Sequence, residues 1–135
     1  MDEYAKAIAD YTEAIRINPE YALAYNNRGA AYRKMGEYDK AIADYTEAIR
    51  INPEDALAYN NRGFTYYKMG EYDKAIADYT KAIEINPNSA DAYYSRGTAW
   101  YPKGEYYKAI VDYSEAIRLD PNFAKAYNKR GNAYR

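Results

Sequence analysis

A fixed period of 34 residues runs through this chain of 135 residues, and it constrains the fold more than any other feature. Proline and two series of glycine each recur at this step: Pro19, Pro53, Pro87 and Pro121; Gly29, Gly63, Gly97 and Gly131; and Gly36, Gly70 and Gly104. Such a period is typical of stacked repeats, in which each unit is one supersecondary element that buries its apolar face only against its neighbours. The period therefore predicts a stacked repeat architecture.

Each unit has the spacing of two α-helices. Apolar side chains of residues 37–50 recur at steps of three and four, which places them on one stripe of a helix, and residues 22–35 carry a second stripe. Gly36 follows the first helix, where a residue that adopts a left-handed conformation is favoured, and Pro53 stands at the start of the next helix. Gly29 lies inside a helix, where glycine costs ~1 kcal/mol relative to alanine, so we expect the partner helix to approach closely there.

These motifs agree with one known repeat pattern over the entire chain. They are YNNRGAAY (25–32), GEYDKA (36–41), YTEA (45–48) and Pro53, and together they resemble the tetratricopeptide repeat family. The resemblance implies an all-α, right-handed superhelical solenoid of antiparallel helix pairs, with about eight helices. It also implies that the first helix of each pair lines a concave groove, which in this family usually binds a peptide or partner protein. One departure is arginine where the family usually has leucine, at Arg28, Arg62, Arg96 and Arg130.

The period divides the chain, which we expect to form a single domain over residues 1–135. Residues 22–55, 56–89 and 90–123 are full repeats, residues 1–21 match a second helix only, and residues 124–135 match a first helix only. On this interpretation each end face lacks a neighbour and the two faces are complementary, so we expect a head-to-tail contact between copies. The residues of this contact are Tyr4, Ile8, Tyr11 and Ile15 at one end and Tyr127, Gly131 and Tyr134 at the other.

Composition argues against several classes of function. The chain has no cysteine and no histidine, and its serines Ser89, Ser95 and Ser114 therefore have no histidine partner. No glycine-rich phosphate loop is present, so we expect a non-catalytic protein without a cofactor or metal. A net charge of -1 argues against a nucleic-acid partner, and no apolar run approaches the ~20 residues that cross a bilayer. We therefore expect a soluble, cytoplasmic protein that binds neither nucleic acid nor membrane.

The 20 tyrosines are the most unusual total. Fifteen of them, with Trp100, occupy four recurring slots of the repeat and are interpreted as packing residues. Among the others, Tyr67 shares a helix face with Asn60 and Phe64, and Tyr94 shares the equivalent face with Tyr101. In the family this face lines the groove. We therefore expect Phe64, Tyr67, Tyr94 and Tyr101 to be more exposed than the framework tyrosines and to contact a ligand, the alternative being that they only cover the groove floor.

Asparagines and lysines give a second polar signal on the first helices. An asparagine amide both donates and accepts, so the residues Asn26, Asn27, Asn60, Asn61 and Asn128 can hold the backbone of an extended peptide, or can merely be hydrated. Several family members have such a ladder at the places of Asn27 and Asn61. Lys125 and Lys129 match the basic pair of a clamp for a terminal carboxylate found in some members. Asn60, Phe64 and Ser95 do not reproduce the rest of that clamp, so we do not expect it.

Two further patterns predict structure rather than binding. The repeated arginines are accompanied by the aspartates Asp10, Asp44, Asp78 and Asp112. We expect each arginine to pair with such an aspartate from the adjoining second helix, because an unpaired charge at a helix interface is costly. Pro102 stands where the earlier repeats have Lys34 and Lys68, so the helix that contains Trp100 should end early or bend.

The sequence favours a non-catalytic module that binds a peptide or protein segment in its concave groove. The alternative is a structural, consensus-like or engineered repeat scaffold that associates head to tail and has no dedicated ligand. Residues 22–55 and 56–89 differ at only seven places, which favours the scaffold because a selective groove needs units that differ. The divergence of residues 90–123 favours the binding module.

Overall fold

The computed structural model describes residues 2–135, and Met1, the first residue of the expected half repeat, lies outside them. The described residues form eight α-helices and one short 3₁₀ turn, which confirms the all-α prediction. They are α1 (Glu3–Ile17), α2 (Ala22–Lys34), α3 (Tyr38–Ile51), α4 (Ala56–Lys68), α5 (Tyr72–Ile85), α6 (Ala90–Trp100), η1 (Tyr101–Lys103), α7 (Tyr106–Leu119) and α8 (Ala124–Tyr134). None of these helices is long and apolar enough to cross a membrane.

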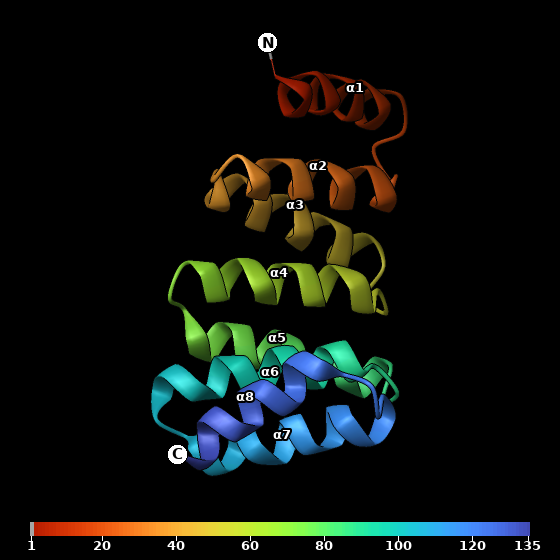
Figure 1. Ribbon diagram of the computed structural model, residues 1–135. Coiled ribbons are helices and arrows are strands. Elements are labelled where there is room, and N and C mark those ends of the chain that lie inside the picture. The colour runs from red at the N-terminus through yellow and green to blue at the C-terminus, as the bar shows by residue number, and fades with distance from the viewer. Residues whose placement is uncertain (1) are drawn as a thin grey trace.

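The helices pack as a solenoid, from α1 at one end of the column to α7 and α8 at the other, so the two ends of the chain lie at opposite ends (Figure 1). Each first helix packs on the second helix of its own repeat, as α2 does on α3, and each second helix packs on the next first helix. In addition α2 contacts α4 and α4 contacts α6. The first helices therefore form a layer of their own, which is called here the inner layer.

Two glycines of each repeat have different roles. One follows the end of the first helix, and the other lies within this helix, packed against the partner helix. Gly36 has φ 81°, and beyond it the backbone N–H of Glu37 donates to the carbonyl of Tyr32 at 2.9 Å. Within α4, a Cβ added to Gly63 would lie 3.0 Å from the Tyr79 ring and 3.2 Å from the carbonyl oxygen of Ala75. The expected close approach of the partner helix is confirmed.

The repeated arginines pair with aspartates as predicted, in three of four repeats. Nε and Nη2 of Arg62 donate to the two carboxylate oxygens of Asp78, each at 2.8 Å, and Arg28 and Arg96 make the same contact with Asp44 and Asp112. Nη1 of each arginine also donates to a hydroxyl of the preceding repeat, such as Thr46 for Arg62 at 3.2 Å. The arginine thus ties three successive helices together.

The effect of Pro102 is also confirmed. Helix α6 ends at Trp100, two residues earlier in the repeat than α2 and α4, and continues as the 3₁₀ turn η1. Proline has no N–H for the carbonyl of Thr98 and its ring clashes with that carbonyl, so an α-helix cannot run through residue 102 undistorted. Gly104, with φ 76°, then closes the turn.

Candidate peptide-binding groove

Two neighbouring cavities are lined by residues of α4 to α8. The larger has a volume of about 180 Å³ and is lined by Tyr67, Thr98, Tyr101, Pro102, Tyr113, Lys129 and Asn132. The smaller, of about 60 Å³, is lined by Phe64, Tyr67, Tyr79, Tyr94, Ser95 and Thr98. Tyr67 and Thr98 line both, so the two cavities share a wall formed by α4 and α6.

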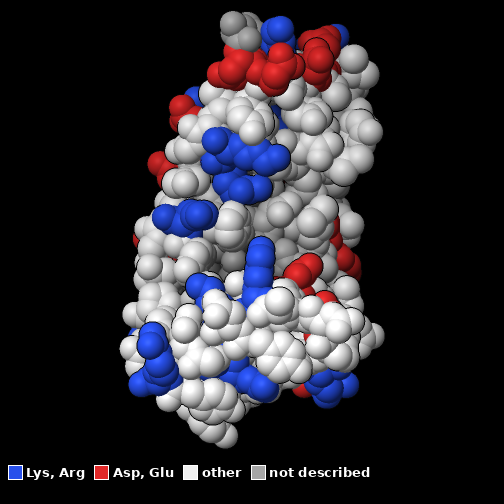
Figure 2. Space-filling model, in the orientation of Figure 1, with Lys and Arg blue, Asp and Glu red and all other residues white. Residues whose placement is uncertain are grey.

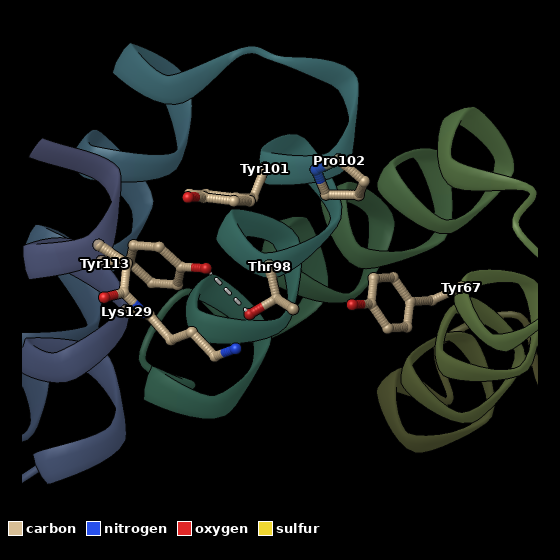
Figure 3. A pocket seen from close by; sticks show the side chains of 7 residues that line it. Tyr67, Thr98, Tyr101, Pro102, Tyr113 and Lys129 are labelled. Atoms are coloured by element: carbon tan, nitrogen blue, oxygen red, sulfur yellow. Dashed lines mark hydrogen bonds between the residues drawn. The ribbon is translucent and has the colours of Figure 1, made fainter. Parts of the chain in front are cut away.

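The early end of α6 shapes the larger cavity. Figure 3 shows Tyr101 and Pro102 at one edge, Tyr67 reaching from α4 toward Thr98, and Tyr113 with Lys129 on the opposite side. Tyr101 is held by an edge-to-face contact with Tyr106, at 5.0 Å between ring centroids. Pro102 is therefore part of the wall as well as the cause of the helix end.

Some polar groups of the larger cavity hydrogen bond to each other, and others are available to donate to a ligand. The hydroxyls of Thr98 and Tyr113 are 3.1 Å apart and hydrogen bond to each other, and burial raises the pKa of Tyr113 to about 12. Burial also raises the pKa of Tyr67, so at neutral pH its hydroxyl stays protonated and can donate. Lys129 is exposed and forms no ion pair within residues 2–135. The cavity thus presents aromatic faces together with an unpaired ammonium.

The structure brings together five of the residues predicted for the groove. Phe64, Tyr67, Tyr94, Tyr101 and Lys129 all line one or both cavities. The prediction that the four aromatic residues are the more exposed ones is wrong in part: Tyr101 is 37% exposed, but the other three are half-buried. Tyr94 stacks on Phe123 at 5.0 Å, and Tyr67 packs 5.6 Å from Tyr72. These rings both line the groove and stabilise the helix stack.

The framework tyrosines also differ from one another more than the repeat predicts. Tyr45, Tyr79 and Tyr113 are buried, because this slot of the second helix faces the glycine of the first helix. The other framework tyrosines are half-buried or exposed, and cationic side chains lie over several of their rings. Burial alone therefore does not separate framework aromatics from groove aromatics.

The predicted asparagines have several different environments. Asn26 is only 4% exposed, and its amide donates to Asp55 at 2.8 Å, while Asp55 accepts from the Ala58 N–H and caps α4. Assigning Asn26 to the ligand-binding surface is therefore incorrect, because its amide links two repeats. Asn60 and Asn61 are half-buried on α4 and line neither cavity.

Three other polar positions lie away from the two cavities. Asn27 lines a separate, open depression between α1 and α2, together with Tyr4 and Lys34. Lys125 and Asn128 are exposed on α8 and line neither cavity. Fewer of the predicted residues line the two cavities than the sequence suggested, and those that do lie on α4 and α8 and at α6 or the turn that follows it.

Sequence reasoning missed several residues of the inner layer. Thr98, Pro102 and Asn132 line the larger cavity, and Arg33 and Lys68 lie on the Phe64 ring, 5.0 and 5.4 Å from its centroid. The sequence did indicate that these two cations have no acidic partner in their own helices, because residues 22–34 and 56–68 contain no acidic residue. Within residues 2–135 no three acidic side chains gather as a metal site would need.

Comparison with known proteins agrees with the repeat architecture. A family model described as TPR repeat matches residues 2–36, 30–70 and 99–135, and two models described as tetratricopeptide repeat match residues 56–89 and 78–110. No curated protein sequence is significantly similar to the chain.

Solved structures resemble the chain over most of its length. Two are described as crystal structures of MamA, with 29% and 30% identity, TM-scores of 0.89 and 0.90, and coverage of 99% and 98% of this chain and 84% and 72% of those chains. A third is described as the first TPR of Spaghetti (RPAP3) bound to HSP90 peptide SRMEEVD, with 29% identity, a TM-score of 0.82, and coverage of 84% of this chain and 90% of that chain.

Proposed function

The chain belongs to the tetratricopeptide repeat family, and we propose that it binds an extended peptide segment of a partner protein along its inner layer without catalysing a reaction. The observation that carries the proposal is the larger cavity. Its volume of about 180 Å³ suits a single side chain, and it combines three tyrosine rings with an unpaired lysine. Aromatic anchors beside a pocket are the usual composition of a binding hot spot.

The peptide-bound neighbour supports this use of the fold. That protein binds the peptide SRMEEVD, and its chain is covered to 90% by the present one. The present groove differs in its chemistry, because aromatic Phe64 stands at a place in the inner layer where a terminal-carboxylate clamp would need a polar side chain. We therefore propose recognition of a side chain within a segment rather than of a chain terminus.

A pair of matched tyrosine variants tests the proposal. Tyr101 and Tyr107 are both exposed tyrosines of the third repeat, but Tyr101 lines the larger cavity whereas Tyr107 does not. Peptides are selected from a displayed random library on the unmodified chain, and their dissociation constants are measured by fluorescence polarisation. Tyr101→Ser should weaken binding by about tenfold or more, which is 1.4 kcal/mol, and Tyr107→Ser should leave it within about twofold. Equal effects of the two variants, or a library without binders, would contradict the proposal.

A second candidate function, head-to-tail association of copies, is favoured by one observation at each end of the stack. Nothing lies within 4 Å of a Cβ on Gly131, whereas a tyrosine ring covers Gly29, Gly63 and Gly97, and Tyr11 is only half-buried while its equivalents are fully buried. The ring of Tyr11 in one copy can cover Gly131 of another, which would continue the stack.

Light scattering over a dilution series tests this association. The apparent mass should rise above 15.6 kDa with concentration, and Gly131→Trp should suppress the rise because it fills the space that Tyr11 would occupy. A constant mass of one chain up to millimolar concentration would exclude association through these faces.

A further inference from the structure

Although the net charge of this protein is only -1, its basic and acidic residues are unevenly distributed between the helices. Helices α2, α4, α6 and α8 of the inner layer contain nine basic residues, Arg28, Arg33, Lys34, Arg62, Lys68, Arg96, Lys125, Lys129 and Arg130, and one acidic residue, Asp91. The other acidic residues all lie in α1, the second helices and the turns. Figure 2 shows lysine and arginine side chains over the ends of α2 and α4, whereas aspartate and glutamate gather around α1 and at the edges.

Pairing within the chain neutralises only part of this positive charge. Arg28, Arg62 and Arg96 form bidentate contacts with aspartates. Within residues 2–135 Arg33 and Lys68 form no ion pair. Lys34, Lys125, Lys129 and Arg130 form none there either, but of the nine basic residues only Arg33 and Lys68 lie over the same aromatic ring.

Arg33 and Lys68 converge on one aromatic ring from successive repeats. The guanidinium of Arg33 lies 5.0 Å from the centroid of the Phe64 ring, and Nζ of Lys68 lies 5.4 Å from the same centroid. Arg33 is half-buried, so its guanidinium is less hydrated than a cation at the open surface and interacts more strongly with a nearby anion.

We propose that Arg33 and Lys68, beside the Phe64 ring, form a subsite for an acidic side chain, a carboxylate or a phosphate, of the segment bound in the groove. This inference rests on the proposed function and names the chemistry of the partner, an acidic segment. The guanidinium donates hydrogen bonds to the anion's oxygens, and the ammonium supplies further charge. The subsite belongs to the first two repeats and is distinct from the cavity between α4, α6 and α8.

A direct experiment observes the arginine side chains by ¹H–¹⁵N NMR while inorganic phosphate or acetate is added. The Nε–H resonance of Arg33 should shift and saturate, while those of Arg28 and Arg62, which are held by aspartates, serve as internal controls and should not. Lys68→Gln should weaken the binding, and Lys74→Gln, which removes an equal charge beside the Tyr66 ring, should not. A linear shift without saturation, or equal effects of the two lysine variants, would overturn the subsite. Saturation by phosphate but not by acetate would assign the subsite to phosphorylated residues. Saturation by both anions would assign it to carboxylates as well.

The second experiment uses peptides selected on the unmodified chain. Acidic residues should be enriched in them, and Arg33→Gln/Lys68→Gln should weaken their binding by about tenfold or more, with Lys40→Gln/Lys74→Gln as the charge-matched control. Replacing the peptide's acidic residue by its amide should remove the difference between the variant and the unmodified chain.

The outcomes separate the subsite from the proposed function. Peptides that depend on Tyr101 but carry no acidic preference would leave the proposed function standing and overturn the subsite. Saturable binding of phosphate at Arg33 with no peptide selected would support an anion site and contradict the groove's role in peptide binding. Thermal unfolding of Arg33→Lys, which keeps the charge, and of Arg33→Gln shows whether a loss of binding follows from loss of the fold.

Discussion

Substituting two equivalent glycines should change stability in opposite directions. Gly63 and Gly131 occupy the same place in two repeats that are two periods apart, and both lie within helices, α4 and α8. Alanine in a helix interior is favoured over glycine by about 1 kcal/mol. At Gly131 nothing lies within 4 Å of the added Cβ, so Gly131→Ala should stabilise the protein by up to about 1 kcal/mol.

At Gly63 the same methyl group has no space. It would lie 3.0 Å from the buried ring of Tyr79 and 3.2 Å from the backbone oxygen of Ala75, neither of which can move away freely. Overpacking of this kind costs about 1–3 kcal/mol, so the net effect of Gly63→Ala should be a destabilisation of roughly 1 kcal/mol. The two variants should therefore differ by about 2 kcal/mol in the free energy of unfolding.

Urea unfolding followed by circular dichroism measures this difference. The midpoint should fall for Gly63→Ala and rise for Gly131→Ala, without a change in the slope that reports the surface exposed on unfolding. If Gly63→Ala were as stabilising as Gly131→Ala, the close approach of the Tyr79 ring would not be the reason for glycine at this position.

Three further predictions concern the arginine pairs, the helix end and pH. Asp78 is only 5% exposed and is more buried than its partner Arg62. Urea unfolding should therefore show that Arg62→Leu destabilises the protein by roughly 2–4 kcal/mol, about as much as Asp78→Asn. The double variant Arg62→Leu/Asp78→Leu should recover most of this loss. Additive losses would show that the charges do not act as a pair. Pro102→Lys should extend α6 by about two residues, increase the helical circular dichroism signal and weaken binding that depends on Tyr101; an unchanged spectrum would contradict the assigned cause of the helix end. Burial raises the pKa of Tyr113 from its ordinary 10.0 to about 12, so the folded state holds this proton more tightly than the unfolded state. The free energy of unfolding should therefore be unaffected below pH 10 and fall between pH 10 and 12, and the fall should be less steep in Tyr113→Phe. An equal fall in the variant and the unmodified chain would refute this role of Tyr113.

Features set by the repeat itself could be predicted from the sequence. The helix pairs, the tight packing at Gly63 and the pairing of Arg62 with Asp78 depend on residues that recur at fixed offsets. The end of α6 depends on one proline and the backbone chemistry of its own turn. Each of these follows from local rules applied to a periodic pattern. The same period also placed Thr46 and its equivalents sixteen residues before each arginine, although this contact was not predicted.

The chemistry of the groove was harder to predict because it depends on contacts between successive repeats. Asn26 looked like a surface amide, but the next repeat supplies Asp55 and buries it. Tyr94 was expected to be exposed, but Phe123 of the same solenoid stacks on it. The cations on Phe64 come from two different repeats, so no single motif contains them.

Mapping a selected peptide onto the protein by NMR tests the central claim most directly. In backbone ¹H–¹⁵N spectra, the largest shifts on adding the peptide should fall on α4, α6 and α8, around Tyr67, Tyr101 and Lys129. Shifts on the outer surface of α3, α5 and α7, around Tyr107, or shifts spread evenly over the chain, would contradict binding in the groove.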